Sequence, residues 1–410
     1  MKIAYLVGEF PKLSETFVTD EIREHYRNGI ELLVVSLFPP DGTVRANLAG
    51  LKVPIFYVFR RRGRLRRLER FWIAFLALLT QRRLWRVPFD SRFGTLADRR
   101  TILGLAYRLK EIEFLSCTDV LHCHFGTLGH LAAALRSLGI IDAKIVTTFH
   151  GFDISEVVKR KGPDYYRLLF HLGSLFLPVS EFWARRLREL GCDPARIKVH
   201  HVGIDCALNA FRERQLDPRR NSPVKLISIG RLVEKKGHTH TLRALAQLHR
   251  KQPDLSLSLD IIGEGDLEHT LKKEASDLGL SDVVTFRGGL PHAETLALLD
   301  QASIFILPSL TSKSGDMEGI PVSLMEAMAH GIPVISTYHS GIPELVEDGV
   351  SGLLVPEGDD TALMRAIERM IDVASRWPET GRAGRETIVA DFNRQALSRR
   401  LIEYYTGLAA

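Results

Sequence analysis

The chain has 410 residues, of which 45% are hydrophobic and 25% charged, and its net charge is +6 at pH 7. This length exceeds one core of ordinary size, so two domains of about 200 residues each are expected. No apolar run approaches the ~20 residues of a membrane span, and no secretory signal is visible, so a cytoplasmic protein is expected. The four cysteines lack metal-type or CxxC spacing and should be free thiols, which argues against redox chemistry.

Strands and helices alternate along the first half of the chain. Short apolar, β-prone segments are separated by stretches with helical signals, which is typical of a doubly wound parallel sheet. The strands expected in this half are residues 2–7, 32–37, 53–58, 119–124, 144–148, 175–179 and 197–201.

A basic and aromatic segment, residues 60–86, interrupts this alternation. Its ten arginines surround the apolar run FWIAFLALL, and Glu69 is its only acidic residue. A helix of this composition can lie in the interface of an anionic membrane. We therefore expect peripheral attachment to the anionic inner membrane through residues 60–86. The alternative is a solvated helix packed on its own domain, and nucleic acid is not expected because no nucleic-acid motif is recognisable.

Histidines lie at the ends of two expected strands. His124 ends the segment DVLHCH and His150 follows KIVTTF, where both could touch a substrate or assist proton movement. We expect His122 to face the opposite side of the sheet. A zinc site would need further ligands at suitable spacing, and none is convincing, so no metal is expected.

The polar segment 212–223 is the expected linker between the domains, since it contains Asp217-Pro218 and Asn221-Ser222-Pro223. An N-terminal domain is expected over residues 1–211 and a C-terminal domain over 224–385. Residues 386–410 are expected to form a helix that returns to the first domain. The strands expected in the second sheet are residues 225–229, 257–262, 283–286, 304–307, 334–336 and 352–355.

Cations follow the first strand of the second sheet, in the turn GRLVEKKGH. Arg231, Lys235 and Lys236 precede a helix there, and such a turn suits a diphosphate. Neither GxxxxGK[ST] nor GxGxxG is present, so the ATPase and dinucleotide-oxidoreductase fingerprints are absent. After a later strand, Arg287-Gly288-Gly289 forms a loop that could hold a planar base through its backbone groups.

The segment EGIPVSLMEAMAHGIP, residues 318–333, combines a turn with a short helix. Pro321 suits the first helical turn, and Gly331 followed by Pro333 predicts the end of the helix. The helix should therefore begin at the carboxyl end of the preceding strand, which is where open α/β sheets bind ligands.

Two acidic side chains and a run of amides lie at the start of this helix. The amides around Gly319, Ile320 and Val322 would present partial positive charge to an anionic or hydroxyl-rich ligand. Glu318 and Glu326 could accept hydrogen bonds from several hydroxyls of one sugar or ribose. The alternative is an exposed acid beside a solvated helix face.

Taken together, GRLVEKKG, RGGL, EGIPVSLMEA, GIPVI and SGIPELV resemble the retaining glycosyltransferases of family four. FPKLSETFV and GDMEGIPVSLMEAM are similar to the exopolysaccharide and colanic-acid type galactosyl- or glucosyltransferases of that family. The resemblance implies the α/β GT-B fold, with two Rossmann-like, doubly wound parallel-sheet domains facing a cleft. The first domain would bind the acceptor and the second the nucleotide sugar.

The resemblance also implies residue roles in the second domain. Arg231 and Lys236 would bind the diphosphate, Glu318 a donor-sugar hydroxyl and Glu326 the ribose. The base would be framed by Arg287 and Gly288, with the amides of Gly319, Ile320 and Val322 completing the donor site.

In the first domain, His150 corresponds to the histidine that approaches the donor sugar in this family. His124 would sit on the acceptor side. Many relatives have a Gly-Gly pair against the phosphate in the first loop, whereas Ser14-Glu15-Thr16 occupies that region here. Either Gly8 or Ser14 could replace that phosphate contact, and Ser14 is a further candidate on the acceptor side.

The implied reaction moves a hexose, glucose or galactose, from a UDP-sugar to a glycan or lipid-linked acceptor with retention at the anomeric carbon. His150, Glu318, Arg231 and Lys236 are the implied catalytic residues. No cofactor is expected, and metal independence is expected because the sequence has no DxD motif. The rivals are a UDP-sugar epimerase of the same fold and a non-catalytic nucleotide-sugar-binding protein.

Overall fold

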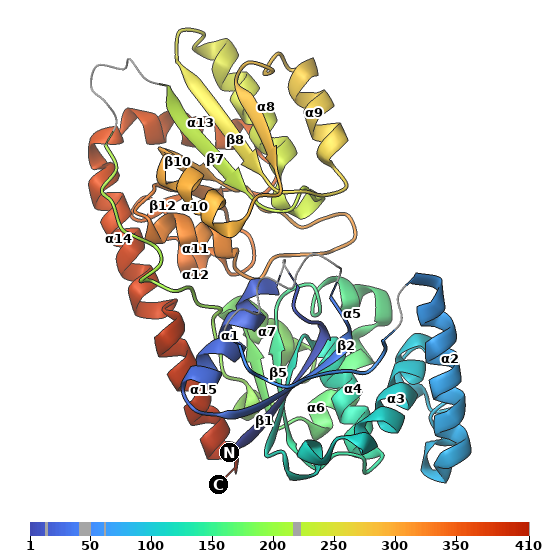
Figure 1. The fold of residues 1–410 in the computed structure, drawn as a ribbon. Coiled ribbons are helices and arrows are strands. Elements are labelled where there is room, and N and C mark those ends of the chain that lie inside the picture. Colours follow the sequence, from blue (N-terminus) through green and yellow to red (C-terminus); the bar gives the residue numbers. More distant parts are fainter. Residues whose placement is uncertain (13–14, 41–50, 61–62, 216–222, 410) are drawn as a thin grey trace. The chain divides into compact units, whose positions relative to one another are not determined.

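The computed structural model describes residues 1–12, 15–40, 51–60, 63–215 and 223–409. The chain divides into two compact units (Figure 1): unit 1 is Met1–His200 with Gln395–Ala410, and unit 2 is His201–Arg394. The change of unit thus falls at residues 200 and 201, whereas the sequence placed the linker at residues 212–223, of which 216–222 lie outside the described residues.

Unit 1 contains a six-stranded parallel sheet in the order β3-β2-β1-β4-β5-β6. Six of the expected strands are present, and the expected strand at residues 197–201 is not. Residues 198 and 200 donate backbone hydrogen bonds to β6, and residue 197 forms one isolated bridge with Phe176, so the segment does not form a regular ladder. The strands are β1 (Lys2–Glu9), β2 (Glu31–Phe38), β3 (Ile55–Tyr57), β4 (Val120–His124), β5 (Lys144–Phe149) and β6 (Leu175–Pro178).

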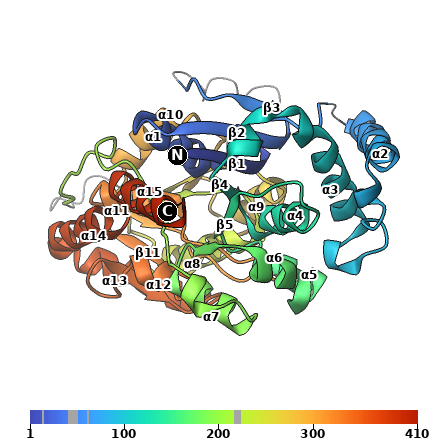
Figure 2. The same ribbon diagram turned by 90° about the horizontal axis from the view of Figure 1, so that it is seen from below.

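Helices cover both faces of this sheet. Figure 2 shows α1 and α15 on one face and α4 on the other, while α2 lies outside α3 in both views. Ile22 of α1 and Tyr405 of α15 pack into the same core as the strand residues Tyr5 and Val34. The helices are α1 (Thr16–Arg27), α2 (Gly63–Thr80), α3 (Leu96–Arg108), α4 (Gly126–Ser137), α5 (Glu156–Lys161), α6 (Arg167–Leu172), α7 (Glu181–Glu189) and α15 (Arg394–Ala409).

Unit 2 contains a second six-stranded parallel sheet, in the order β12-β11-β10-β7-β8-β9. Each expected strand of this half is present. Its strands are β7 (Val224–Ile229), β8 (Leu257–Ile262), β9 (Val284–Gly288), β10 (Ile304–Ile306), β11 (Val334–Thr337) and β12 (Gly352–Val355).

Two hydrophobic cores lie on the two faces of the second sheet. Leucines of α8 and α13 fill one core, and residues of α11 with Ile388 of α14 fill the other. The single helix expected over residues 386–410 is two helices. Its first residues belong to the end of α14, which ends at Asp391, and the rest form α15, which begins at Arg394. The helices are α8 (His238–Lys251), α9 (Glu268–Asp277), α10 (His292–Asp300), α11 (Val322–Ala329), α12 (Ile342–Leu345), α13 (Asp360–Asp372) and α14 (Trp377–Asp391).

Candidate functional site

A buried carboxylate lies between two lysines at the carboxyl edge of the second sheet. Glu318, in the loop between β10 and α11, is only 8% exposed. Its Oε2 is 3.1 Å from Lys236 Nζ, and its Oε1 is 3.6 Å from Lys235 Nζ. Burial alone would raise the pKa of Glu318, but the two ammonium groups lower that pKa to about 2, so the side chain is ionised. Burial lowers the pKa of Lys236, and Glu318 opposes that shift.

The turn after β7 delivers both lysines to this point. Lys235 and Lys236 end a short 3-10 turn, Glu234–Lys236, and Gly237 follows with a φ of +71°. A Cβ on Gly237 would lie 2.0 Å from the carbonyl oxygen of Pro308, so only glycine lets this turn pack against the loop after β10. Lys235 Nζ also contacts Asp316 Oδ1 at 3.0 Å, which ties the turn to the Glu318 loop.

A histidine that the sequence analysis missed holds the Glu318 loop in place. The backbone N–H of Glu318 donates to His339 Nε2 at 3.0 Å, so the ring proton is on Nδ1, which lies 2.6 Å from Glu357 Oε1. The Ser340 hydroxyl donates to the carbonyl oxygen of Glu318 at 2.7 Å. Ser340 adopts a φ of +50°, in the region that favours glycine. The segment HSGIPELV therefore positions Glu318, which its sequence alone did not reveal.

Helix α11 begins directly after this loop. Pro321 is its N-cap, and no side chain caps the first helical amides. Gly319 and Ile320 lie in the loop before this start, and Val322 is the first helical residue. Gly331, with a φ of +74°, follows the last turn, as the sequence predicted.

Glu326 lies in the middle of α11, and its side chain is 12% exposed. Its Oε1 is 2.8 Å from Nε2 of His292, at the start of α10. The His292 side chain is 62% exposed, so the Glu326 carboxylate lies beside a solvent-exposed ring. The structure thus places Glu318 in the loop before α11 and Glu326 about one turn into the helix.

The remaining expected donor residues differ in their surroundings. Arg231 lies two residues after the end of β7 and is exposed. Arg287 Nε donates to Asp260 Oδ1 at 2.7 Å, and both side chains line a cavity of about 180 Å³ under α10. Gly288 has a φ of +70°, and its carbonyl oxygen accepts the Gly263 amide at 2.9 Å. The base-framing roles of Arg287 and Gly288 stay predictions, and any contact from Arg287 must share the guanidinium with Asp260.

In unit 1, the structure brings His124 and His150 together. His124 Nδ1 lies 3.1 Å from His150 Nε2. His124 is 1% exposed, so its ring meets other side chains, and its expected acceptor-side role stays a prediction. Ser14 lies outside the described residues.

The expectation for His122 was wrong. Its ring stacks on that of His124 at 4.6 Å between centroids, so both project from the same face of β4. The physical reason is the period of two in a strand, which places residues i and i+2 on one face.

Asp153, which the sequence analysis did not single out, joins the loops after β4 and β5. Its Oδ1 accepts the amides of His150 at 3.0 Å and Gly151 at 3.1 Å, and its Oδ2 accepts the Gly126 amide at 2.6 Å. Burial raises the pKa of Asp153 to about 6 although these amides favour the ionised form. Asp153 therefore fixes the backbone that carries His150.

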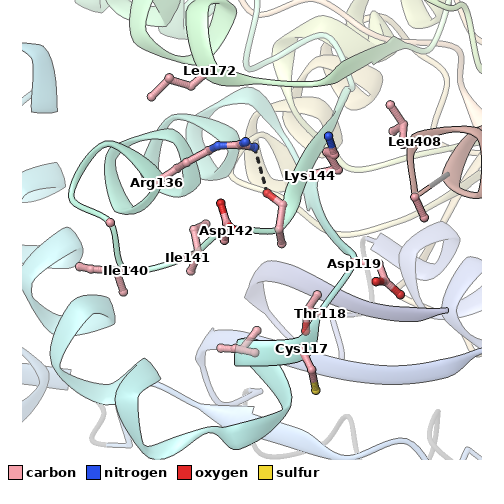
Figure 3. Close-up of a pocket in the computed structure, with 14 residues that line it drawn as sticks. Cys117, Thr118, Asp119, Arg136, Ile140, Ile141, Asp142, Lys144, Leu172 and Leu408 are labelled. Atoms are coloured by element: carbon pink, nitrogen blue, oxygen red, sulfur yellow. Dashed lines mark hydrogen bonds between the residues drawn. The ribbon is translucent and has the colours of Figure 1, made fainter.

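A cavity of about 920 Å³ lies at the other edge of the first sheet (Figure 3). Asp119 precedes β4 and Lys144 begins β5, so the cavity is at the amino ends of the strands. Arg136 crosses it and donates to the carbonyl oxygen of Ala143 at 3.1 Å. Because ligands of open α/β sheets bind at the carboxyl ends, we assign the cavity no part in the candidate site.

Comparison with protein families gives one match for each half of the chain. Residues 14–208 match the model of the family described as Glycosyltransferase Family 4. Residues 210–386 match that of the Glycosyl transferases group 1.

Curated relatives span the whole chain. A putative colanic acid biosynthesis glycosyltransferase of Salmonella typhimurium is 39% identical, with 98% of each chain covered. The amylovoran biosynthesis glycosyltransferase AmsK of Erwinia amylovora is 35% identical, with 100% of each chain covered.

Solved structures with the same fold include HepE of Anabaena in complex with UDP-glucose. It has a TM-score of 0.73 at 18% identity and covers 99% of this chain and 100% of its own. Sucrose-phosphate synthase of Thermosynechococcus elongatus has a TM-score of 0.73 at 18% identity and covers 100% of this chain and 99% of its own. At these identities the likeness concerns the fold, which is the two-sheet α/β GT-B architecture.

Proposed function

The chain belongs to the family 4 glycosyltransferases, and from this premise we propose that it transfers glucose or galactose from a UDP-sugar, with retention, in exopolysaccharide biosynthesis. The acceptor would be a glycan or a lipid-linked oligosaccharide. Relatives named for colanic acid and amylovoran biosynthesis support the glycan class. A neighbour in complex with UDP-glucose supports the donor class.

The observation that carries this proposal is the buried Glu318 beside Lys235 and Lys236. As the glycosidic bond breaks, negative charge grows on the leaving diphosphate, and cations stabilise it more in the transition state than in the ground state. Lys236 and the exposed Arg231 would supply these cations, together with the amides at the start of α11. Glu318, whose loop is tied to His339 at 3.0 Å, would hold a hydroxyl of the donor sugar.

The remaining contacts to the donor would come from residues around α11, β9 and the loop after β5. Glu326 would hold the ribose, since its carboxylate lies about one helical turn beyond the loop and contacts the exposed His292 ring at 2.8 Å. Arg287 and Gly288 would frame the base, and His150 would contact the donor sugar. We propose that the reaction needs no cofactor and no metal, because the sequence has no DxD motif.

The test is a donor screen with UDP-glucose, UDP-galactose, UDP-N-acetylglucosamine and GDP-mannose, using membrane extract as acceptor. Nucleotide release and a product heavier by one hexose are expected with one UDP-hexose, unchanged by a chelator. Interconversion of UDP-sugars without acceptor would favour the epimerase. Saturable binding with no release under any condition would favour a non-catalytic binding protein.

A second proposal concerns membrane attachment through α2. Six apolar side chains on α2 are exposed, and Trp72 is the most exposed aromatic residue among them at 58%. The opposite side of α2, with Ile73 and Ala77, is buried against α3. The exposed members are Leu68, Phe71, Trp72, Phe75, Leu76 and Leu79.

This exposed strip has the chemistry of an interfacial helix. No helix within the described ranges is long and apolar enough to cross a bilayer. Arg82, Arg83 and Arg86 are all exposed nearby, and Arg83 and Arg86 also donate to backbone carbonyls at 2.9 and 2.7 Å. The side chains of residues 61–67 lie outside the described part. We propose that α2 seats the protein on the cytoplasmic face of an anionic membrane.

Co-sedimentation with vesicles of anionic or neutral lipid tests the attachment. Binding to anionic vesicles should fall with added salt, and the double variant Trp72→Ser, Phe75→Ser should lose it. Leu208→Ser is the matched control, because Leu208 is an exposed apolar residue of unit 2. Equal loss in the control, or equal binding to neutral vesicles, would discard the proposal.

A further inference from the structure

The proposed function assigns roles to two of the three cations in the turn after β7 and leaves Lys235 without one. The side chain of Lys235 is 9% exposed, and its Nζ lies 3.0 Å from Asp316 Oδ1 and 3.6 Å from Glu318 Oε1. Nζ also donates to the carbonyl oxygen of Met317 at 3.4 Å. An ammonium group carries three protons, so these three oxygens of one loop match its donors in number.

The backbone holds both members of the Lys235–Asp316 pair in place. The carbonyl oxygen of Lys235 accepts the Leu310 amide at 2.9 Å, which fastens the turn to the loop after β10. Asp316 closes a tight turn with Ser312: its amide donates to Ser312 Oγ at 2.9 Å, and its carbonyl oxygen accepts the Ser312 amide at 3.0 Å. Lys235 is therefore anchored to the Glu318 loop by its main chain and by its ammonium group.

Lys236 is in a different electrostatic position. Its Nζ lies 3.1 Å from Glu318 Oε2. Burial lowers the pKa of Lys236, and the like charges of Lys235 and Arg231 lower that pKa further, against the opposing effect of Glu318. A second anion beside Lys236 would relieve this repulsion. Of the two lysines, Lys236 is thus the one suited to turn to a diphosphate.

Binding of a diphosphate would change the surroundings of Glu318, which would then share its nearest cation with the phosphates. Burial raises the pKa of Glu318, and Lys236 and Lys235 together bring it down to about 2. When Lys236 is shared, the charge of Lys235 becomes what keeps the carboxylate ionised beside the phosphates. The charged and titratable groups around Glu318 come from three loops: Lys235 and Lys236 after β7, Asp316 in its own loop, and His339 after β11.

We propose that Lys235, anchored by Asp316, is a positioning residue that stays the counter-ion of Glu318 while Lys236 binds the diphosphate of the donor. Lys235 thereby keeps Glu318 ionised and in place to accept a hydroxyl of the donor sugar. The role toward the donor rests on the proposed function, whereas the ion pair itself does not. In the sequence the two lysines are neighbours in one turn, and no local pattern separates their roles.

The test compares Lys235→Met with Lys236→Met in the full chain, by calorimetric titration of UDP and by turnover of the UDP-hexose. Lys235→Met should lower kcat about ten- to a hundredfold, because the sugar loses an oriented contact, while the Kd for UDP stays within about threefold. Lys236→Met should raise that Kd about tenfold or more, because a charged partner of the diphosphate is lost. Lys235→Arg keeps the charge and should recover part of the rate. Lys273→Met, in an exposed ion pair on α9, is the matched control and should change neither quantity.

The pH profile of kcat separates the proposed role from a merely structural one. Loss of the Lys235 charge raises the pKa of Glu318, so the acid limb should lie at higher pH in Lys235→Met than in wild type or Lys235→Arg. Asp316 acts through Lys235, so Asp316→Asn alone should lower kcat less than Lys235→Met does. Added to Lys235→Met, it should lower kcat no further. If Lys235→Met does not fold, Asp316→Asn takes its place in the comparison.

Loss of UDP affinity in Lys235→Met equal to that in Lys236→Met would assign Lys235 to the diphosphate and overturn the proposal. A wild-type rate, or a wild-type acid limb, in Lys235→Met would overturn it as well. Wild type that is inactive with every donor would count against the proposed function instead. In that case ¹³C titration of the Glu318 carboxyl, assigned by its loss in Glu318→Gln, decides on the ion pair: the pKa should be higher in Lys235→Met than in wild type, and an equal pKa would refute the pair.

Discussion

The buried Glu318 of unit 2 and the half-buried Glu21 of unit 1 both lie near the carboxyl edge of a six-stranded parallel sheet, but their partners differ in kind. Glu318 faces two ammonium groups, at 3.1 and 3.6 Å. Glu21 faces a phenol and two imidazoles, at 2.9 to 3.4 Å. Ammonium groups can be shared with an incoming diphosphate, so the first arrangement suits anion binding. The partners of Glu21 include no ammonium group, so the second arrangement is less suited to binding a diphosphate.

The largest expected effect follows from removing a lysine. Lys236→Ala leaves Glu318 buried without its nearest cation, so the free energy of unfolding should fall by roughly 3 kcal/mol, the lower end for a broken buried pair. UDP affinity and turnover should fall as well, because Lys236 would bind the diphosphate. Chemical denaturation and calorimetric titration measure the two losses.

Lys251→Ala is the matched control for that variant. Lys251 makes an exposed ion pair with Glu368 at 2.7 Å, far from the candidate site in the sheet. Its removal should leave both the unfolding midpoint and UDP affinity unchanged. Equal losses in the two variants would remove the distinction between a buried and an exposed pair.

The second prediction concerns the loss of folding stability at acidic pH. The pKa of Glu318 is lowered from 4.5 to about 2, so the stability that its ionised form contributes is present above pH 4.5 and is lost as the pH falls towards 2. By linkage the loss totals about 3 kcal/mol. Denaturation of wild type and Glu318→Gln at pH 7, 4 and 3 should therefore converge as the pH falls. Glu347→Gln, on an exposed loop, should run parallel to wild type throughout.

The third prediction is that unit 1 loses stability at a higher pH than unit 2 does as the solution is acidified. The neutral form of His150 is favoured by folding, so its contribution is present above pH 6.5 and is lost as the pH falls below that value. The stability difference between wild type and His150→Gln should thus begin to shrink between pH 7 and 5, where that of Glu318→Gln is still constant. A common onset for both variants would contradict the comparison.

A smaller effect is expected at the ribose. Glu326→Ala should weaken UDP and UDP-sugar alike, by about 1 to 3 kcal/mol for a charged hydrogen-bonding partner. His292→Ala leaves the carboxylate in place and removes only its exposed neighbour, so UDP affinity should change little. If His292→Ala weakened UDP binding as much as Glu326→Ala does, the ribose contact would be assigned to His292 instead.

The sequence predicted the elements that periodic patterns specify. The strands of both sheets and helix α11 with its stop at Gly331 are present because buried parallel strands and glycine stops have strong local signatures. The strand expected at residues 197–201 is absent because β-prone residues do not reveal whether the backbone forms a regular ladder with its neighbour or only an isolated bridge.

Residues that act through tertiary contacts were not predictable in the same way. His339 reaches Glu318 across 21 residues, and Tyr405 reaches His122 across 283. Glu21 and Asp153 carry no local motif, since their partners come from other loops and helices. The misplacement of His122 was avoidable, because strand alternation alone puts it on the same face as His124.

The central claim, that Glu318 holds the donor sugar and not the nucleotide, is tested most directly by Glu318→Ala. Calorimetric titration of UDP and turnover with the UDP-hexose are measured on the same preparation, after circular dichroism has shown that the variant is folded. The account predicts a UDP affinity close to that of wild type with turnover lowered on the order of a hundredfold, because the reacting ring loses its orientation. Loss of UDP binding, or turnover at the wild-type rate, would contradict it.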